Sequence, residues 1–203
     1  MLLIYLFLIS MIIILNMKYP YFLLLSLVIT VSSCNTTSDL QTEFNCDHKT
    51  SYSNLKKHAD VRGLFNMKIP KHWKTKLYYD NTQSSIYTAD TTKSLTKSTL
   101  IDVTIIHNPI NFDVDFQKKM EKQSKAEQLH ILKSRSFSFF KRVSYFNLAK
   151  GKRGKYTYHI LNLFIKTNSD NFIHIKTEVY GDSLVDKRFC EAIKLIELIE
   201  LNQ

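Results

Sequence analysis

Few residues of this chain have the types and spacings that chemistry requires. The sequence contains no Gly-x-Ser-x-Gly nucleophile motif, no His-Glu-x-x-His or Cys-x-x-Cys metal or redox motif, and no phosphate-binding Walker loop. No two of its seven histidines lie at positions i and i+2 or i and i+4. Histidines could therefore form a metal site only if residues far apart in the sequence meet in the folded protein. We therefore expect no metal, no cofactor and a surface poor in clefts. The histidines are His48, His58, His72, His107, His130, His159 and His174.

Two carboxylates and two histidines remain as candidates for a site. Asp102 and Glu178 fall in expected strands and could line a cleft as catalytic groups. His159 and His174 could face each other across a hairpin of two late strands, where packing between neighbouring strands explains them better than metal binding does. None of these four residues is assigned a catalytic, cofactor-binding or metal-binding role.

Cys34 is the cysteine whose surroundings predict a specific modification. It ends the string Val31-Ser32-Ser33-Cys34, which resembles the bacterial lipobox of an aliphatic residue, two small residues and a cysteine. We expect Cys34 to carry diacylglycerol and usually an N-acyl chain, which would anchor the protein to a membrane stably. An ordinary secretory signal with an incidental cysteine is the alternative.

The residues before Cys34 have the composition of an export signal. The segment from Met17 has one basic residue, Lys18, then the apolar run 21–31 and small residues, which is the order of a signal peptide. We expect residues 1–33 to be the signal peptide and Met17 to be its true start. A transmembrane anchor is the alternative, although each apolar run is shorter than the roughly 20 residues that cross a bilayer.

The other two cysteines are candidates for a disulfide. If Cys34 is lipidated, Cys46 and Cys190 form an even pair in an oxidising compartment. Cys46 lies just before the expected domain, and Cys190 lies at the edge of the apolar stripe of the last helix. The alternative is two unpaired thiols, with Cys190 packed as a small hydrophobic residue.

Charge and polarity limit the possible partners. Lys and Arg number 28 against 18 Asp and Glu, for a formal net charge of +10. Residues 34–51 are largely polar and are expected to be a tether between the lipid and one globular domain at 52–203. An exported, membrane-tethered chain excludes nucleic acid as a physiological partner. The basic clusters around Trp73 and at 150–155 predict either a solvated face or an anionic surface partner, such as lipid headgroups or cell-wall polymers.

The folded part is expected to be an α+β domain, an antiparallel sheet of about six to seven strands with helices on both faces. Residues 113–126 form a helix with Asp113 as its N-cap, and residues 183–200 form an amphipathic helix that Asp182 or Ser183 could cap. Both faces of the segment 155–166 are apolar, which predicts an interior strand covered on two sides. The expected strands are 64–69, 76–79, 85–88, 100–107, 129–133, 142–149, 155–166 and 172–180.

The segment 65–73 resembles the opening of the Mog1/PsbP-like fold, an apolar strand that ends in Pro70 and is followed by Trp73. The resemblance continues through 101–105, the middle helix, the Gly151–Gly154 hairpin and the segment 190–193, and spans about residues 60–200. Proteins of this fold are mostly non-catalytic, so the resemblance implies a binding or assembly role and scaffold roles for Pro70 and Trp73.

Two functions follow from these observations. The first is a non-enzymatic lipoprotein of the bacterial cell envelope, anchored at Cys34 and facing the periplasm or the exterior, with an envelope protein or an anionic surface as its partner. The second is an envelope hydrolase whose site is not visible as a motif. A deep polar cleft with converging carboxylates or a His–Ser pair would favour the second.

Overall fold

The computed structural model describes residues 39–46 and 51–202, which belong to one compact unit, Thr37–Gln203. The expected signal peptide at 1–33, the start at Met17 and the lipid attachment at Cys34 lie outside the described residues. Within the described part, no helix combines the length and the apolar character needed to cross a membrane.

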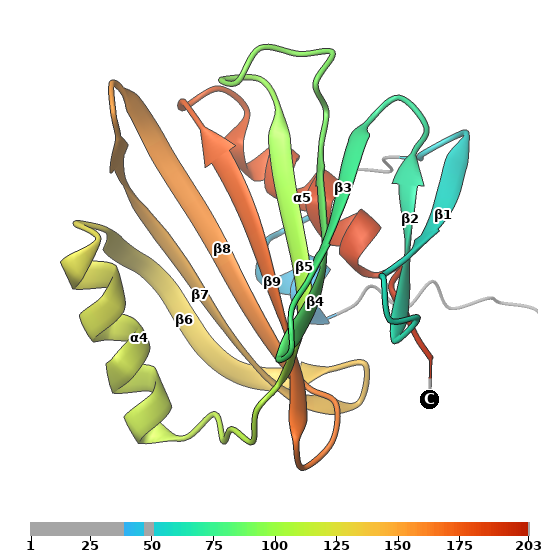
Figure 1. The fold of residues 1–203 in the computed structure, drawn as a ribbon. Helices are drawn as coiled ribbons and strands as arrows, with labels where there is room; N and C mark the ends of the chain where they lie inside the picture. Colours follow the sequence, from blue (N-terminus) through green and yellow to red (C-terminus); the bar gives the residue numbers. More distant parts are fainter. Residues whose placement is uncertain (1–38, 47–50, 203) are drawn as a thin grey trace, which may run out of the picture. The chain divides into compact units, whose positions relative to one another are not determined.

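A seven-stranded antiparallel sheet forms the body of the domain (Figure 1). Its strand order is β3-β4-β5-β9-β8-β7-β6, and every neighbouring pair is antiparallel. The strands are β3 (Lys74–Tyr79), β4 (Gln83–Ala89), β5 (Thr99–His107), β6 (His130–Phe139), β7 (Arg142–Arg153), β8 (Tyr156–Lys166) and β9 (Asn171–Tyr180). The strand expected at 155–166 is β8, which lies inside the sheet as predicted.

Three short strands make a second sheet, which sequence reasoning foresaw only in part. Its order is β1-β2-β10, with β1 at Leu55–Ala59, β2 at Phe65–Pro70 and β10 at Glu200–Leu201. The expected strand at 64–69 is β2, but it pairs with β1 and β10 and not with the main sheet. Pro70 ends β2, and Trp73 packs against the main core, in keeping with their scaffold roles.

The two faces of the main sheet have different covers (Figure 1). Helix α5 (Val185–Ile196) buries Phe189, Ala192 and Ile193 against aliphatic residues of β8 and β9 such as Leu161 and Ile175. Seven of its twelve residues are buried, because its apolar side chains recur at helical spacing. This face is the main hydrophobic core.

Helix α4 (Val114–Ala126) covers part of the opposite face. It buries few side chains, and Phe116 is the main one, in edge-to-face contact with Tyr145 and Phe164 at ring-centroid distances of 5.4 and 5.1 Å. The Asp113 carboxylate accepts a hydrogen bond from the Phe116 amide, so the predicted N-cap is confirmed. Helices on both sheet faces confirm the expected α+β architecture.

The N-cap predicted for the last helix is wrong. The cap residue of α5 is Leu184, in a left-handed conformation and without a side-chain cap hydrogen bond. Asp182 instead accepts from Thr157 at 2.7 Å and pairs with Lys150 at 3.2 Å. These partners on the β7–β8 hairpin hold the Asp182 carboxylate away from the helix.

Part of the expected tether is also folded. Residues Asp39–Glu43 form helix α3, and the Leu40 side chain is fully buried. The Phe44 ring packs against Phe146 and Phe189, and Glu43 forms ion pairs with strand β6. Tertiary contacts outweigh the polar character of this segment, so residues 39–46 belong to the domain.

Cys46 and Cys190 form a disulfide in the structure, with their Cα atoms 5.4 Å apart. The bridge joins the segment that follows α3 to the buried side of α5. It closes a loop of 144 residues in sequence separation, and the chain-entropy model assigns such loops a large stabilisation. The folding of residues 39–46 onto the domain and the disulfide therefore support each other.

We predict that this disulfide forms in solution and stabilises the domain. In a Cys34→Ala background, replacing Cys46→Ala and Cys190→Ala should lower the free energy of unfolding by about 2–5 kcal/mol. Urea denaturation measures this difference. Alkylation of the denatured, non-reduced Cys34→Ala protein should modify neither cysteine, and complete alkylation without reductant would contradict the bridge.

Candidate functional site

A polar cavity lies between α4 and the sheet, on the face opposite α5. Its volume is about 210 Å³, which contradicts the expectation of a surface poor in clefts. Its floor is made by strands β7, β8 and β9, and residues of α4 and the loop after it close one side. The lining residues are Met120, Gln123, Ser124, Glu127, Leu129, Asn147, Arg153, Tyr158, Ile160, Asn162, Phe164, His174, Lys176 and Glu178.

Strand register places a row of polar residues across this face. Asn147 of β7 lies opposite Asn162 of β8, Asn162 opposite Lys176 of β9, and Lys176 opposite Asp102 of β5. Residues directly opposite each other in antiparallel strands share a face, so the four side chains are neighbours. We call Asn147, Asn162, Lys176 and Asp102 the polar row. The polar row forms because the register of the four strands pairs these polar residues with one another.

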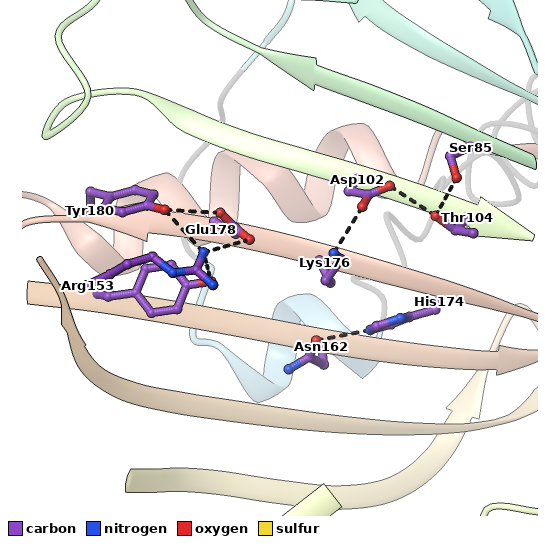
Figure 2. Close-up of polar contacts among 10 residues, drawn as sticks. Ser85, Asp102, Thr104, Arg153, Asn162, His174, Lys176, Glu178 and Tyr180 are labelled. Carbon is purple, nitrogen blue, oxygen red and sulfur yellow. Dashed lines mark hydrogen bonds and ion pairs between the residues drawn. The ribbon is translucent and has the colours of Figure 1, made fainter. Parts of the chain in front are cut away.

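The charged groups at this face neutralise one another (Figure 2). Lys176 pairs with Asp102 at 3.1 Å, and Arg153 pairs with Glu178 at 3.6 Å. The Arg153 guanidinium also donates to the Tyr180 hydroxyl at 3.3 Å and lies over the ring of Tyr158. Each cation that lines the cavity therefore has a carboxylate partner.

Hydrogen bonds extend this network away from the cavity. The Asp102 carboxylate accepts from the Thr104 hydroxyl at 3.0 Å, and Thr104 shares a hydrogen bond with Ser85 at 2.9 Å (Figure 2). Burial and the nearby Glu178 raise the pKa of Tyr158, so this phenol stays protonated. The side chains that flank the cavity are held in fixed orientations.

His174 is neutral and hydrogen-bonded. Its ring stacks on Phe164 with centroids 4.2 Å apart, and its Nε2 lies 3.0 Å from the Asn162 Oδ1 (Figure 2). Burial, followed by the charge of Lys176, lowers the pKa of His174 to about 3. Neutral His174 donates from Nε2 to the Asn162 oxygen in this arrangement, which leaves Nδ1 as an acceptor. A histidine with so low a pKa is a poor general base near neutral pH.

Asn147 is the unusual residue of the polar row. Its side chain is only 1% exposed, and neither its Nδ2 nor its Oδ1 has a hydrogen-bond partner within the described part of the chain. A buried polar group without a partner costs stability, so such groups are rare in folded proteins. Asn147 thus lies at the cavity wall with its amide buried and without a partner among the described residues.

The structure brings some of the candidate residues together and separates others. Asp102 and Glu178 lie on the same sheet face, and each has a cationic partner. Glu178 lines the cavity, and Asp102 lies beside it. His159 and His174 do not face each other, so that prediction is wrong. His159 lies opposite Val179, whereas His174 lies opposite Phe164 and on the other side of the sheet. In this register, even-numbered residues of β8 pair with even-numbered residues of β9. Side chains alternate between the two faces along a strand, so His159 and His174 lie on opposite faces.

No metal centre is visible in the described ranges, 39–46 and 51–202. These residues contain no group of three or more His, Cys, Asp or Glu side chains placed to hold an ion. The hydrogen bonds of His107 and His174 go to asparagines, and the ion pairs of His72 and His159 go to aspartates. These histidines therefore pair with asparagine or aspartate, and none of these contacts is a His–Ser pair.

The basic clusters are surface features of two kinds. Lys71, Lys74 and Lys76 are exposed around the start of edge strand β3. In the second cluster, Lys150 and Arg153 have carboxylate partners. Lys152 and Lys155 of the second cluster are exposed, so both clusters present lysines at the surface.

Sequence reasoning missed Asn147 and the cavity. The weak signal was the presence of polar residues on strands that are otherwise strongly apolar, at Asn147, Asn162 and Lys176. Their meeting depends on the register of three strands, which no single segment specifies.

Comparison with known proteins supports the fold and does not identify a family. No family model matches the chain, and no curated protein sequence matches it. The chain is similar to CyanoP, the cyanobacterial PsbP of Synechocystis sp. PCC 6803, with 12% identity and a TM-score of 0.55 over 76% of this chain and 96% of that one. The chain therefore has the Mog1/PsbP-like fold that its sequence suggested.

Two further structures are similar at lower scores. The Ran-binding protein Mog1p of Saccharomyces cerevisiae has 12% identity over 74% of this chain and 96% of its own, with a TM-score of 0.49. LpqN, involved in cell envelope biogenesis of Mycobacterium tuberculosis, has 7% identity over 74% of this chain and 93% of its own, with a TM-score of 0.46. At these identities the likeness concerns the fold alone.

We predict that Asn147→Leu stabilises the protein. Leucine has nearly the shape of asparagine and removes the cost of burying an unpartnered amide, about 1–3 kcal/mol. The free energy of unfolding in urea should therefore rise by about 1 kcal/mol or more. A matched Asn81→Leu exchange in the exposed β3–β4 turn should leave it nearly unchanged. A clear loss of stability in Asn147→Leu would mean that water already satisfies the amide.

A second prediction concerns acid. Because the pKa of His174 falls from 6.5 to about 3 on folding, the unfolded chain binds its proton first as the pH drops. Stability is therefore lost between about pH 6.5 and pH 3, and His174 contributes to that loss. His174→Gln should flatten the dependence of unfolding free energy on pH in this window, whereas His130→Gln on exposed β6 should not. Equal slopes in His174→Gln and the parent protein would refute this.

Proposed function

We propose that this chain is a non-enzymatic lipoprotein of the bacterial cell envelope, and that the cavity under α4 is its binding site. The observation that carries the binding role is the state of the cavity's polar groups. The two cations, Arg153 and Lys176, are paired with carboxylates, His174 is neutral, and the buried amide of Asn147 has no partner among the described residues. An amide can hold a ligand through hydrogen bonds and is not an acid, a base or a nucleophile at neutral pH.

The envelope location rests on the sequence and on the disulfide. The segment 17–34 has the order of a signal peptide that ends in a lipobox. The Cys46–Cys190 disulfide fits an exported protein, because such bonds persist in oxidising compartments. On this proposal the membrane is the first partner, through Cys34, and an envelope protein or an anionic surface facing the Lys71–Lys76 cluster is a second.

The alternative of an envelope hydrolase has one observation in its favour. Glu178 and Asp102 share a face with a polar cavity, and paired carboxylates could act as acid and base. However, each carboxylate is ion-paired and hydrogen-bonded, which fixes it in a structural contact. The cavity is therefore better suited to binding than to proton transfer.

The lipoprotein part of this proposal predicts a labelling result. In bacterial cells fed a clickable fatty acid, the parent protein should be labelled and fractionate with membranes. Cys34→Ala should lose the label and leave the membrane fraction, because the thiol that accepts the lipid is gone. The Cys46→Ala/Cys190→Ala variant serves as a control and should keep the label. Equal labelling of the parent and Cys34→Ala would contradict lipidation at this residue.

A further inference from the structure

One end of the seven-stranded sheet collects connections that are rich in lysine (Figure 1). Strand register brings together there the β2–β3 turn at 70–74, the β4–β5 loop at 90–98, the β7–β8 hairpin at 151–155 and the connection from β9 into the first turn of α5 at 181–188. We call these four segments the basic end. Both lysine clusters seen in the sequence reach this end, although they are about 80 residues apart in the chain.

Contacts between the four segments hold them side by side. Arg188 of α5 donates to backbone carbonyl groups at the end of the β4–β5 loop and at the end of β9, at 3.1 and 3.0 Å. Lys150, beside the β7–β8 hairpin, pairs with Asp182 at 3.2 Å. His72 of the β2–β3 turn lies 4.0 Å from Asp90 of the β4–β5 loop. The basic end is therefore one continuous surface.

The charge of this surface is mostly uncompensated. Lys93 pairs with Asp90 at 3.0 Å, and Arg153 pairs with Glu178 at 3.6 Å. Asp186, in the first turn of α5, is an exposed carboxylate of the same region. The excess positive charge attracts anions. Its exposed lysines without an ion pair among the described residues are Lys71, Lys74, Lys97, Lys152, Lys155 and Lys187.

Three lysines surround a hollow at the start of α5. The hollow has a volume of about 380 Å³ and is lined by Lys93, Lys97 and Lys187, with Leu184 as an apolar part of its wall. Arg188 also lines it, but this side chain is 5% exposed and donates to backbone carbonyl groups, so the lysine ammonium groups are the accessible charges. A space of this size can hold a phosphate-bearing headgroup of roughly ten non-hydrogen atoms.

Two exposed leucines lie beside these lysines, and folding does not explain them. Leu184 is 65% exposed, and Leu95 in the β4–β5 loop is 42% exposed. Leu184 is also the cap residue of α5, with a φ of 51° and no side-chain cap hydrogen bond. Leucine is poorly suited both to a left-handed backbone and to capping a helix. An apolar side chain that neither packs nor caps is expected where the surface meets an apolar phase outside the protein.

We propose that the basic end lies on an anionic lipid bilayer, with Leu95 and Leu184 at the boundary of headgroups and acyl chains and the lysines on lipid phosphates. Electrostatic attraction and burial of apolar side chains act together in proteins that lie on a membrane. A soluble anionic polymer satisfies the lysines but leaves the leucines in water, so the bilayer is the better occupant. The proposal rests on the envelope location proposed above and adds a second membrane contact to the lipid anchor at Cys34.

Vesicle binding in the absence of the lipid anchor tests this surface. Residues 37–203, the compact unit, with the disulfide intact, are sedimented with vesicles of phosphatidylglycerol and phosphatidylcholine in equal amounts. The protein should bind these vesicles at low salt and dissociate at high salt, because salt screens the attraction. Vesicles of phosphatidylcholine alone should bind it far more weakly. Equal binding to both kinds of vesicle would overturn the proposal.

Lysine variants show whether the basic end is responsible. Lys97→Gln/Lys187→Gln should weaken binding by about twenty- to thirtyfold, since one lysine near an anionic surface contributes about fivefold. Lys119→Gln/Lys122→Gln on exposed positions of α4 removes the same charge and should bind nearly as the parent does. Equal weakening by the two double variants would mean that net charge, and not this surface, drives binding.

A leucine variant tests the contact with the bilayer. Leu184→Asn should weaken binding by about fourfold or more, which is the effect of one buried CH₂ group. Asparagine tolerates a left-handed backbone and caps helices, so the fold should be kept. Val114→Asn, at a residue that is 63% exposed at the start of α4, is the matched control and should bind as the parent does.

The remaining outcomes separate the possible occupants. If a glycerol phosphate polymer binds as tightly as the mixed vesicles, and Leu184→Asn binds both as the parent does, the bilayer is overturned and a soluble anionic polymer takes its place. If a variant does not fold, the comparison of the two kinds of vesicle with the parent protein still decides the question. Failure of this surface is distinguishable from failure of the anchor, because the fatty-acid label depends on Cys34 and not on the basic end.

Discussion

The different burial of the two faces of the seven-stranded sheet is the constraint on which the rest of this structure depends. Strand β8 carries apolar residues on both sides, so each face of the sheet needs a cover. Helix α5 closes one face with a continuous stripe of buried side chains. Helix α4 has only a thin apolar edge, centred on Phe116, and closes the other face in part. The polar cavity exists because this second cover is incomplete.

The well-covered face also holds the first described segment, residues 39–46. Helix α3 and Phe44 pack on this side, and the Cys46–Cys190 disulfide ties them to α5. Arg188 of α5 is 5% exposed and donates to the carbonyl oxygens of Ser98, Tyr180 and Gly181, which joins the helix to the ends of β9 and of the loop before β5. Charged hydrogen bonds to buried carbonyl groups hold the position of this helix more specifically than aliphatic packing alone.

The cavity face is stabilised differently, by pairing charges and sharing hydrogen bonds. Both ion pairs are partly exposed, and ion pairs that reach the solvent contribute little net stability, so Arg153–Glu178 and Lys176–Asp102 mainly fix side-chain positions. Asn147 lowers stability where it stands, because its amide has no partner among the described residues. A residue that lowers stability is expected at a position where ligand binding, rather than folding, has determined which amino acid is present.

The sequence by itself determined the features that local patterns encode. The apolar stripe of α5, the two apolar faces of β8 and the Asp113 cap of α4 each depend on residues close together in the chain, and each is present in the structure. Only the tertiary structure decided which side chains meet. Residues 39–46 look polar, yet they fold because Leu40 and Phe44 find a cover on the distant α5 and β7. The polar row forms because β7, β8, β9 and β5 pair in one particular register, and register depends on the packing of the whole sheet rather than on any one strand.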